Sequence, residues 1–372
     1  MNTKVCIGVF FGGRSGENAV SLMSARSILS VLSPEKYNVI QIGITQEGRW
    51  LSGENVLEAL TSGDTASLFP VTLLPDPGDP TLYAIRQSAA GEVLEPLAAL
   101  DVAFPVLHGS FGEDGTIQGL FEMCGLAYVG AGVLGSAAGM DKALFKDVIR
   151  SHNLPVVESI TVLSREVKTQ LDYVIERAEA LASYPLFVKP VNLGSSVGVN
   201  KCRNREELKS GLLDAARYDR RVLIERGINA REIELSVLGN DEPIASIPGE
   251  IRPVEEFYSY NAKYIDARTE LFIPASLEPD TIARFQELAV QAYRVIDCAG
   301  MARVDFLMDK ETGAIYLSEI NTIPGFTKIS MYPKLWEASG ISYPDLVNRL
   351  VALALERKAE MNQIERSYGS TG

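Results

Sequence analysis

The hydrophobic positions near the N-terminus predict a parallel β-sheet with helices packed on its faces. A continuous apolar run at Val5–Phe11 ends at a Gly-Gly pair, which is typical of a buried parallel strand. An apolar stripe of helical period follows over Ala19–Leu32, and strands are predicted at Val39–Ile44 and Val102–Leu107. Because strands and helices alternate, we expect an α/β fold. The weakly patterned stretch 52–99 is interpreted as an elaborated surface excursion.

The rest of the chain predicts two further groups of elements. The predicted helices cover 134–152, 279–297 and 343–358. The predicted strands are Pro185–Val191, Val222–Arg226, Arg231–Leu238, Ala302–Met308 and Ala314–Asn321, the last two forming a hairpin. We therefore expect three domains, at 1–139, 140–225 and 226–372.

Composition narrows the class of protein. The 372 residues, 46% hydrophobic and 22% charged, are typical of a globular chain of two or three domains. The net charge of −13 argues against a partner nucleic acid or a membrane surface, since both require a basic face. The four cysteines are scattered, and neither a signal segment nor an apolar stretch of ~20 residues is present. We expect a cytoplasmic protein.

The predicted hairpin brings oxygen ligands close to an arginine. If the turn is centred on the Asp-Lys-Glu-Thr-Gly segment, Arg303 faces Glu319 across the ladder. One pair further on, Asp305 faces Leu317, and alternation places all four on one face with Asn321. Two carboxylates and a carboxamide are ligands that Mg²⁺ prefers. A solvated strand face with one Arg–Glu pair explains the pattern equally well.

A glycine- and serine-rich loop follows the strand that ends at Lys189-Pro190. Backbone N–H groups of Gly194–Gly198 could bind phosphate, with the lysine as a point charge. An ordinary Gly/Ser turn is the simpler interpretation of the loop alone. Lys189 weakens that interpretation, because a lone lysine is costly in such an apolar strand.

The segment His108–Gly115 lies at the C-terminal end of a predicted strand, where open α/β sheets bind ligands. Its three glycines permit close backbone approach, and Glu113 and Asp114 lie near a predicted helix start. An acidic helix cap explains Asp114 but leaves His108 without a reason.

The irregular, aromatic segment Phe257–Tyr264 has the composition of a loop that closes over a reactive intermediate. A loop whose tyrosines only pack against the core is the alternative.

Taken together, these motifs resemble those of the D-alanine–D-alanine ligases of the ATP-grasp superfamily, over nearly the whole chain. The residues that carry the resemblance are Phe11–Ser15, His108–Gly115, Met140–Lys142, Val188–Pro190, Gly194–Gly198, Lys263-Tyr264, Arg303–Asp305 and Glu319–Thr327. It implies an ATP-grasp fold with a Rossmann-like N-terminal domain, and the ATP-dependent joining of two D-alanines through an acyl phosphate for peptidoglycan synthesis. It also implies a homodimer.

The resemblance further implies a role for each matching residue. The expected ATP contacts are Lys142, Lys189, Ser196, Glu225 at the adenine, Glu232 at the ribose, Phe257, Tyr258 and Lys263. The expected ligands of two Mg²⁺ ions, or of Mn²⁺ as an alternative, are Asp305, Glu319 and Asn321. The expected catalytic groups are Arg303 and the Gly325 N–H at the oxyanion, with Ser195 and Tyr264 closing the loop. The expected substrate contacts are His108 and Glu113 for the first D-alanine, and Ser330 and Met331 for the second.

One position departs from the family pattern. The family usually reads Ser-x-Glu-His-Glu-Val-Ser after the first strand, whereas Ala19 replaces the second glutamate here. That glutamate pairs with the first substrate's ammonium, and its loss could cost ~1.5–3 kcal/mol. Either Glu17 or Glu113 compensates, or the first substrate differs or binds weakly. D-serine as second substrate, and a nucleotide-binding protein without catalysis, are alternatives, although the retained metal-ligand set argues against the latter.

Overall fold

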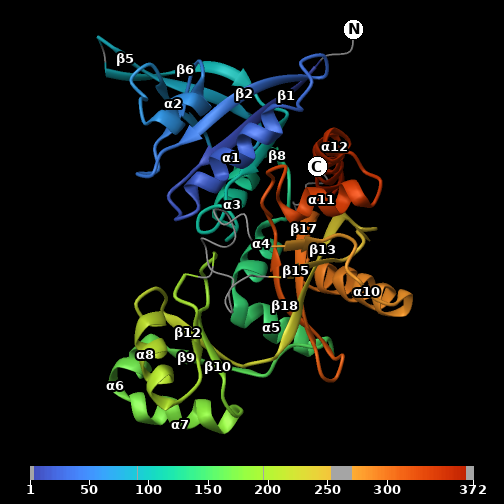
Figure 1. Cartoon of the computed structure of the whole chain (residues 1–372). Coiled ribbons are helices and arrows are strands. Elements are labelled where there is room, and N and C mark those ends of the chain that lie inside the picture. Colours follow the sequence, from blue (N-terminus) through green and yellow to red (C-terminus); the bar gives the residue numbers. More distant parts are fainter. Residues whose placement is uncertain (1–3, 90, 196, 253–269, 366–372) are drawn as a thin grey trace.

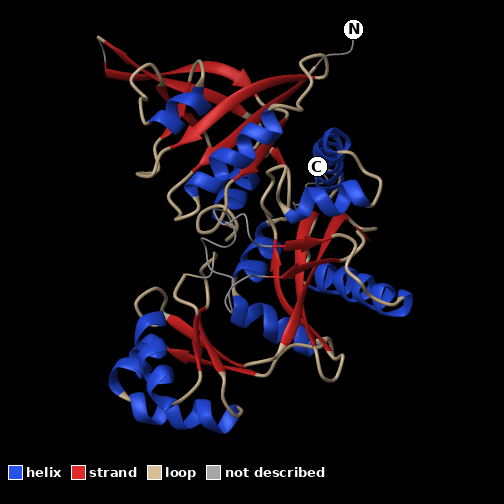
Figure 2. Ribbon diagram, in the orientation of Figure 1, coloured by secondary structure: helices blue, strands red, loops and turns tan. Residues whose placement is uncertain are grey.

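The computed structural model describes residues 4–89, 91–195, 197–252 and 270–365, which form three β-sheets with helices on their faces (Figures 1 and 2). The first sheet has eight strands in the order β6-β5-β4-β3-β2-β1-β7-β8. Their bounds are β1 Val5–Gly12, β2 Tyr37–Ile44, β3 Trp50–Ser52, β4 Phe69–Leu73, β5 Thr81–Ser88, β6 Gly91–Ala99, β7 Val102–Val106 and β8 Ala127–Tyr128. Its helices are α1 Asn18–Leu29, α2 Val56–Ser62 and α3 Thr116–Met123.

The centre of this sheet is parallel, as predicted, because β1 pairs with both β2 and β7 in parallel. The interpretation of residues 52–99 as a surface excursion is wrong. This stretch contributes β4, β5 and β6, which extend the sheet in antiparallel pairs from β3. Almost every residue of β6 is exposed, so the strand lacks the buried face that produces a period-two pattern.

The predicted helix over 134–152 consists of two helices, α4 Val133–Met140 and α5 Lys142–Ser151. Asp141 separates them in an extended conformation, with φ −84° and ψ 97°. Its carboxylate accepts a hydrogen bond from Leu144 N at 2.9 Å, as an N-cap does. The break makes Lys142 the first residue of α5.

The second sheet is antiparallel and has four strands in the order β11-β10-β12-β9. Its strands are β9 Ser159–Leu163, β10 Leu186–Pro190, β11 Asn200–Cys202 and β12 Arg221–Arg226, and its helices are α6 Ser164–Thr169, α7 Leu171–Leu181 and α8 Arg205–Ala215. Helices α7 and α8 pack against its strands and enclose a separate hydrophobic core (Figure 1).

The third sheet has six strands, with β16-β15-β13-β17-β18 in order and β14 paired with β13. Its strands are β13 Ala230–Gly239, β14 Ile244–Ala245, β15 Gly249–Arg252, β16 Glu270–Phe272, β17 Gly300–Asp309 and β18 Ile315–Asn321. The C-terminal helices are α10 Pro279–Val295, α11 Met331–Ala338 and α12 Tyr343–Met361. None of the helices among the described residues combines the length and apolar character needed to cross a bilayer.

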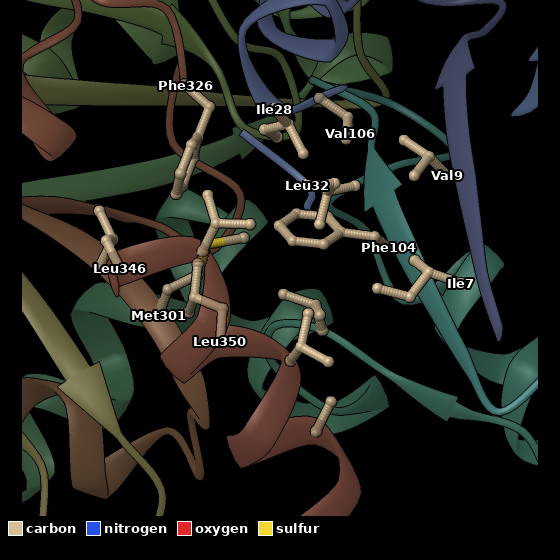
Figure 3. Close-up of a cluster of buried hydrophobic side chains, with 14 of the residues drawn as sticks. Ile7, Val9, Ile28, Leu32, Phe104, Val106, Met301, Phe326, Leu346 and Leu350 are labelled. Atoms are coloured by element: carbon tan, nitrogen blue, oxygen red, sulfur yellow. The ribbon is translucent and has the colours of Figure 1, made fainter. Parts of the chain in front are cut away.

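One hydrophobic core joins the first sheet to the C-terminal helices. Ile7 and Phe104 of the first sheet lie in the same buried cluster as Met301 of β17 and Leu346 and Leu350 of α12 (Figure 3). The N- and C-terminal parts of the chain are therefore packed as one body, whereas the four-stranded sheet has its own core. The boundaries at 139 and 225 stay a prediction.

Candidate active site

Strands β17 and β18 form the predicted hairpin, but the predicted register is wrong. Arg303 faces Asn321 and Asp305 faces Glu319, because the turn already shifts the pairing, with Met308 facing Ile315, and a β-bulge after Asp305 shifts it again. The bulge turns Leu317 into the core, where its side chain is fully buried, so Leu317 does not share the polar face. The three predicted metal ligands, Asp305, Glu319 and Asn321, still lie together, and we call them the oxygen cluster.

Arg303 is held by two carboxylates. Its Nε and Nη2 lie 2.7 Å from the two oxygens of Asp305, and Nε also lies 3.0 Å from Glu234 Oε2. Asn321 Nδ2 donates to Asp305 at 3.0 Å. Glu234 lies on β13 directly opposite Asp305 and was not among the predicted site residues. Its position two residues after Glu232, on the same face of an alternating strand, is the signal that could have identified it.

The oxygen cluster suits a hard divalent cation. Asp305 and Glu319 are cross-strand neighbours, and Asn321 donates through its nitrogen, which leaves its amide oxygen as an acceptor. Two carboxylates and one amide oxygen leave coordination positions for water and phosphate, as Mg²⁺ prefers. Over the described ranges, no three His, Cys, Asp or Glu residues gather in a way that could hold a metal.

The glycine- and serine-rich loop that follows β10, from Val191 to Gly198, is called the serine loop here. Lys142 links this loop to the oxygen cluster. Its Nζ donates to the Leu193 carbonyl at 2.9 Å and lies 3.5 Å from Glu319 Oε2. The same loop is tied to the start of α5, because Asn192 Nδ2 donates to Asp141 at 3.1 Å. A predicted phosphate-binding lysine thus lies between the two motifs expected to hold the nucleotide.

Glu225 is buried between two lysines. Lys146 Nζ lies 2.6 Å from its Oε1, and Lys189 pairs with its other oxygen. Burial alone would raise the pKa of Glu225, but the two ammonium groups lower it to about 2, so the carboxylate is charged. Lys146 was not predicted, although its spacing of four residues from Lys142 places both on one face of α5. Contact of Glu225 with adenine stays a prediction.

Lys189 lies near the third sheet as well as near its own. Burial lowers the pKa of its ammonium, but Glu225, and to a smaller extent Glu319 and Glu232, raise it overall. The predicted phosphate lysine, ribose partner and metal ligand are therefore brought together from β10, β13 and β18.

Ser195 contacts a carboxylate from the first domain. Its Oγ donates a hydrogen bond to Glu17, and its backbone has a φ of 53°. Glu17 is buried and packs so closely on Gly109 and Gly194 that a Cβ at either would lie 2.5 or 2.7 Å from Oε2. Ala19, in contrast, is exposed. The Glu17 carboxylate thus lies between the serine loop and the His108 segment. It comes from a residue two positions before Ala19, where the family has its glutamate.

His108 ties the first sheet to the loop after β18. Its Nδ1 lies 2.9 Å from the Ile323 carbonyl and its Nε2 lies 3.1 Å from Ser24 Oγ. Because a carbonyl only accepts, Nδ1 carries the proton, and the Ser24 hydroxyl donates to Nε2 of the neutral ring. Burial lowers the pKa of His108, which favours this neutral form. Ser24 Oγ also accepts from Phe326 N at 3.2 Å.

Glu113 bridges the same two segments. Its oxygens accept hydrogen bonds from Gly109 N at 2.7 Å and from Ile323 N at 3.1 Å. Burial, and then the nearby Glu17 carboxylate, raise the pKa of Glu113 to about 8. His108 and Glu113 together fasten the loop that carries Gly325.

The residues predicted for the oxyanion and the second substrate meet at the start of α11. A Cβ on Gly325 would lie 3.0 Å from Ser330 Oγ, which itself accepts from Thr327 N at 3.1 Å. The Met331 side chain is buried with Leu335 in a small cluster, so a contact with substrate would use its backbone. Five predicted residues lie outside the described residues, namely Ser196, Phe257, Tyr258, Lys263 and Tyr264.

An antiparallel four-stranded sheet and a larger antiparallel sheet, with lysines of one beside carboxylates of the other, define an ATP-grasp protein. The chain matches the family models described as D-ala D-ala ligase N-terminus over residues 6–131 and D-ala D-ala ligase C-terminus over residues 148–352. The chain belongs to the D-alanine–D-alanine ligase family.

Similar proteins cover its whole length. It is 51% identical to the D-alanine–D-alanine ligase of Heliobacterium modesticaldum, over 96% of each chain, and 48% identical to that of Natranaerobius thermophilus, over 99% of this chain and 100% of the relative. The D-alanine–D-alanine ligase of Coxiella burnetii superposes with a TM-score of 0.80 at 35% identity, covering 97% and 96% of the chains. The VanG D-Ala:D-Ser ligase of Enterococcus faecalis superposes with a TM-score of 0.84 at 33% identity, covering 95% and 100%.

Proposed function

We propose that this protein joins two D-alanines to D-alanyl-D-alanine, converting ATP to ADP and phosphate, as a step of peptidoglycan precursor synthesis. The observation that carries the proposal is the meeting of Lys142, Lys189, the oxygen cluster and Arg303 in one site. A ligase needs this set, because it must hold a triphosphate and stabilise a charged intermediate close by. The relatives at about half identity, which are D-alanine–D-alanine ligases, support the same reaction.

The chemistry proceeds in two displacements. The carboxylate of the first D-alanine attacks the γ-phosphorus of ATP, which forms an acyl phosphate and releases ADP. The amine of the second D-alanine, after losing a proton, attacks the acyl carbon, and the tetrahedral intermediate expels phosphate. The guanidinium of Arg303 and the N–H of Gly325 stabilise the oxyanion of that intermediate.

The phosphates are held by the lysines and a divalent metal. Lys142 and Lys189 bind phosphate oxygens, with Lys263 as a third. Asp305, Glu319 and Asn321 would hold two Mg²⁺ ions, or Mn²⁺, and the bound metal would supply positive charge to the phosphates. Ser196, Glu225, Glu232, Phe257 and Tyr258 complete the nucleotide site.

Glu17 takes the place of the family glutamate that is Ala19 here. Its contacts with Ser195, Gly109 and Gly194 place a charged carboxylate beside His108 and Glu113, where the first ammonium is expected. The protein therefore keeps D-alanine as first substrate, and the loop residue Tyr264 with Ser195 closes the site.

The second substrate is proposed to be D-alanine, held by Ser330 and the Met331 backbone. D-serine is the second candidate, since the VanG ligase has a closely similar structure. We further propose a cytoplasmic homodimer, which fits the resemblance to the family and a reaction that consumes ATP.

The proposal is tested by measuring ADP release with ATP, Mg²⁺ and a panel of D-alanine, D-serine and D-lactate, with the product identified by mass. We expect D-alanyl-D-alanine as the main product with D-alanine alone. ADP release without a dipeptide, or no ADP at any D-alanine concentration, contradicts the proposal. Arg303→Met should abolish dipeptide formation, whereas Arg231→Met, an arginine of the same sheet that pairs with Glu250, should retain it.

A further inference from the structure

Glu234 is a buried carboxylate that the proposed reaction does not use. Its side chain is about 8% exposed, and its Oε2 lies 3.0 Å from Arg303 Nε. Buried carboxylates are costly unless they are paired, and the pair with Arg303 offsets part of this cost for Glu234. The same guanidinium makes two contacts of 2.7 Å with Asp305. Arg303 therefore has two carboxylate partners on one face of the third sheet, the buried Glu234 and the half-buried Asp305.

One of these partners is also needed elsewhere. Asp305 is a proposed metal ligand, and its lone pairs are those that accept the two hydrogen bonds of Arg303. A divalent cation on Asp305 competes for these lone pairs and repels the guanidinium. The contact between Arg303 and Asp305 is then weakened. The Arg303 side chain is only 17% exposed, so weakening a carboxylate contact leaves its charge less well compensated, which is unfavourable.

We propose that Glu234 is a positioning residue that holds Arg303 at the oxyanion site while Asp305 binds the metal. This inference rests on the metal and oxyanion roles under the proposed function. Glu234 is suited to the task because β13 is paired on both sides at this point, with Gly249 of β15 and with Asp305 of β17. Its carboxylate is therefore fixed to the centre of the sheet.

Glu234 also contributes to the net charge of the charged groups at and around the oxygen cluster. With Glu234, three carboxylates (Glu234, Asp305 and Glu319) stand against two cations, Arg303 and Lys142. If Glu234 loses its charge, the net charge of these five residues rises from −1 to zero. Arg303 also loses one of its two carboxylate partners within this set. The less negative charge attracts a cation less strongly, and Arg303 depends more on Asp305. Asp305 is therefore a poorer metal ligand when Glu234 is neutralised.

The test measures metal binding without turnover. Free Mn²⁺ is followed by electron paramagnetic resonance in the presence of ADP and the full-length protein, with no D-alanine. We expect Glu234→Gln to weaken Mn²⁺ binding by about tenfold, the scale typical of groups that support a metal ligand. Glu234→Asp keeps the charge and should recover part of the loss. In the ligase assay, Glu234→Gln should lower kcat, and higher Mg²⁺ should restore it in part.

Glu250→Gln is the matched control. Glu250 is buried in the same sheet and pairs with Arg231 and Arg252, away from the oxygen cluster. The inference is overturned if Glu234→Gln binds Mn²⁺ like the wild type, or if Glu250→Gln loses as much affinity. Failure of the wild type itself to bind Mn²⁺ with ADP overturns the proposed metal site, and this inference with it.

Discussion

Glu17 is the residue whose charge the proposed first-substrate site depends on most. Its carboxylate is buried and contacts Ser195, whereas Ala19 is exposed. Glu17→Gln keeps an acceptor for Ser195 but removes the charge opposite the ammonium. A charge-assisted bond contributes ~1.5–3 kcal/mol, so the first-site KM for D-alanine should rise about tenfold or more.

Steady-state kinetics over a range of D-alanine concentrations measure this KM, with the exposed Glu35→Gln as control. Ala19→Glu alone should change the first-site KM little, because Glu17 already supplies the carboxylate. Combined with Glu17→Gln, it should recover part of the lost affinity. An unchanged KM in Glu17→Gln would show that another group holds the ammonium.

Glu113 makes folding depend on pH. Burial and the Glu17 carboxylate raise its pKa from an ordinary 4.5 to about 8, with Arg303 and the two backbone N–H groups opposing the shift. The folded state thus binds this proton more tightly than the unfolded state. The stabilisation is complete below the unfolded pKa and is lost as the pH rises through 8.

Glu113→Gln removes this titration and disturbs one of the two backbone hydrogen bonds. Between about pH 5.5 and about pH 9.5, the difference in Tm between wild type and variant should be largest at the acidic end and should shrink as the pH rises through about 8. Thermal unfolding across this range measures it, with the exposed Glu58→Gln as control. A difference that does not vary with pH would contradict the raised pKa.

At the scale of elements, Asp141 is the junction on which the nucleotide site depends. It caps α5 through Leu144 N, pairs with Arg221 and accepts from Asn192 of the serine loop. Asp141→Ala removes all three contacts from a buried position. A lost cap costs ~0.5–2 kcal/mol, and the unpaired Arg221 adds to it. The KM for ATP should rise as well, because Lys142 and the serine loop lose their common anchor.

Asp141→Asn separates these contributions, since the amide still caps the helix but carries no charge. We expect a smaller loss of stability in chemical denaturation and a smaller rise in the KM for ATP than in Asp141→Ala. If Asp141→Ala destabilises the protein without changing this KM, the junction supports the fold alone.

The elements that the sequence predicts best are those with a strong local pattern. β1 and β7 are continuous apolar runs, and their parallel pairing follows from the helices between them. β6 could not be identified in this way because nearly all its residues are exposed. The break at Asp141 and the bulge after Asp305 each interrupt an element at a single position, so a periodic pattern passes over both.

In the candidate site too, residues that belong to sequence motifs were predicted and residues outside such motifs were missed. Lys142, Lys189, Arg303 and the oxygen cluster belong to recognisable motifs, and the structure brings them together. Lys146 and Glu234 are ordinary residues of a helix and a strand, and only packing shows that they pair with Glu225 and Arg303. Residue spacing places each on the same face as a predicted site residue, but only the tertiary contacts show which partner each one pairs with.

For the whole molecule, the distribution of cores predicts which parts unfold together. One cluster contains Ile7 of β1, Phe104 of β7 and Leu350 of α12, although these lie far apart in the sequence (Figure 3). The four-stranded sheet is packed around a separate cluster that includes Leu212 of α8. Segments that share a core tend to open as one cooperative unit. We therefore expect β1, β7 and α12 to form one unit, and β9–β12 another.

Two truncations of fully buried leucines distinguish these units, each costing ~2–5 kcal/mol. Leu350→Ala should accelerate hydrogen exchange in β1 and β7 as much as in α12, and leave β10 and β12 unchanged. Leu212→Ala should do the reverse. Hydrogen exchange followed by mass spectrometry on the intact protein measures both, each variant serving as the other's control. Acceleration by Leu350→Ala confined to α12 would mean that the shared core does not couple the two ends of the chain.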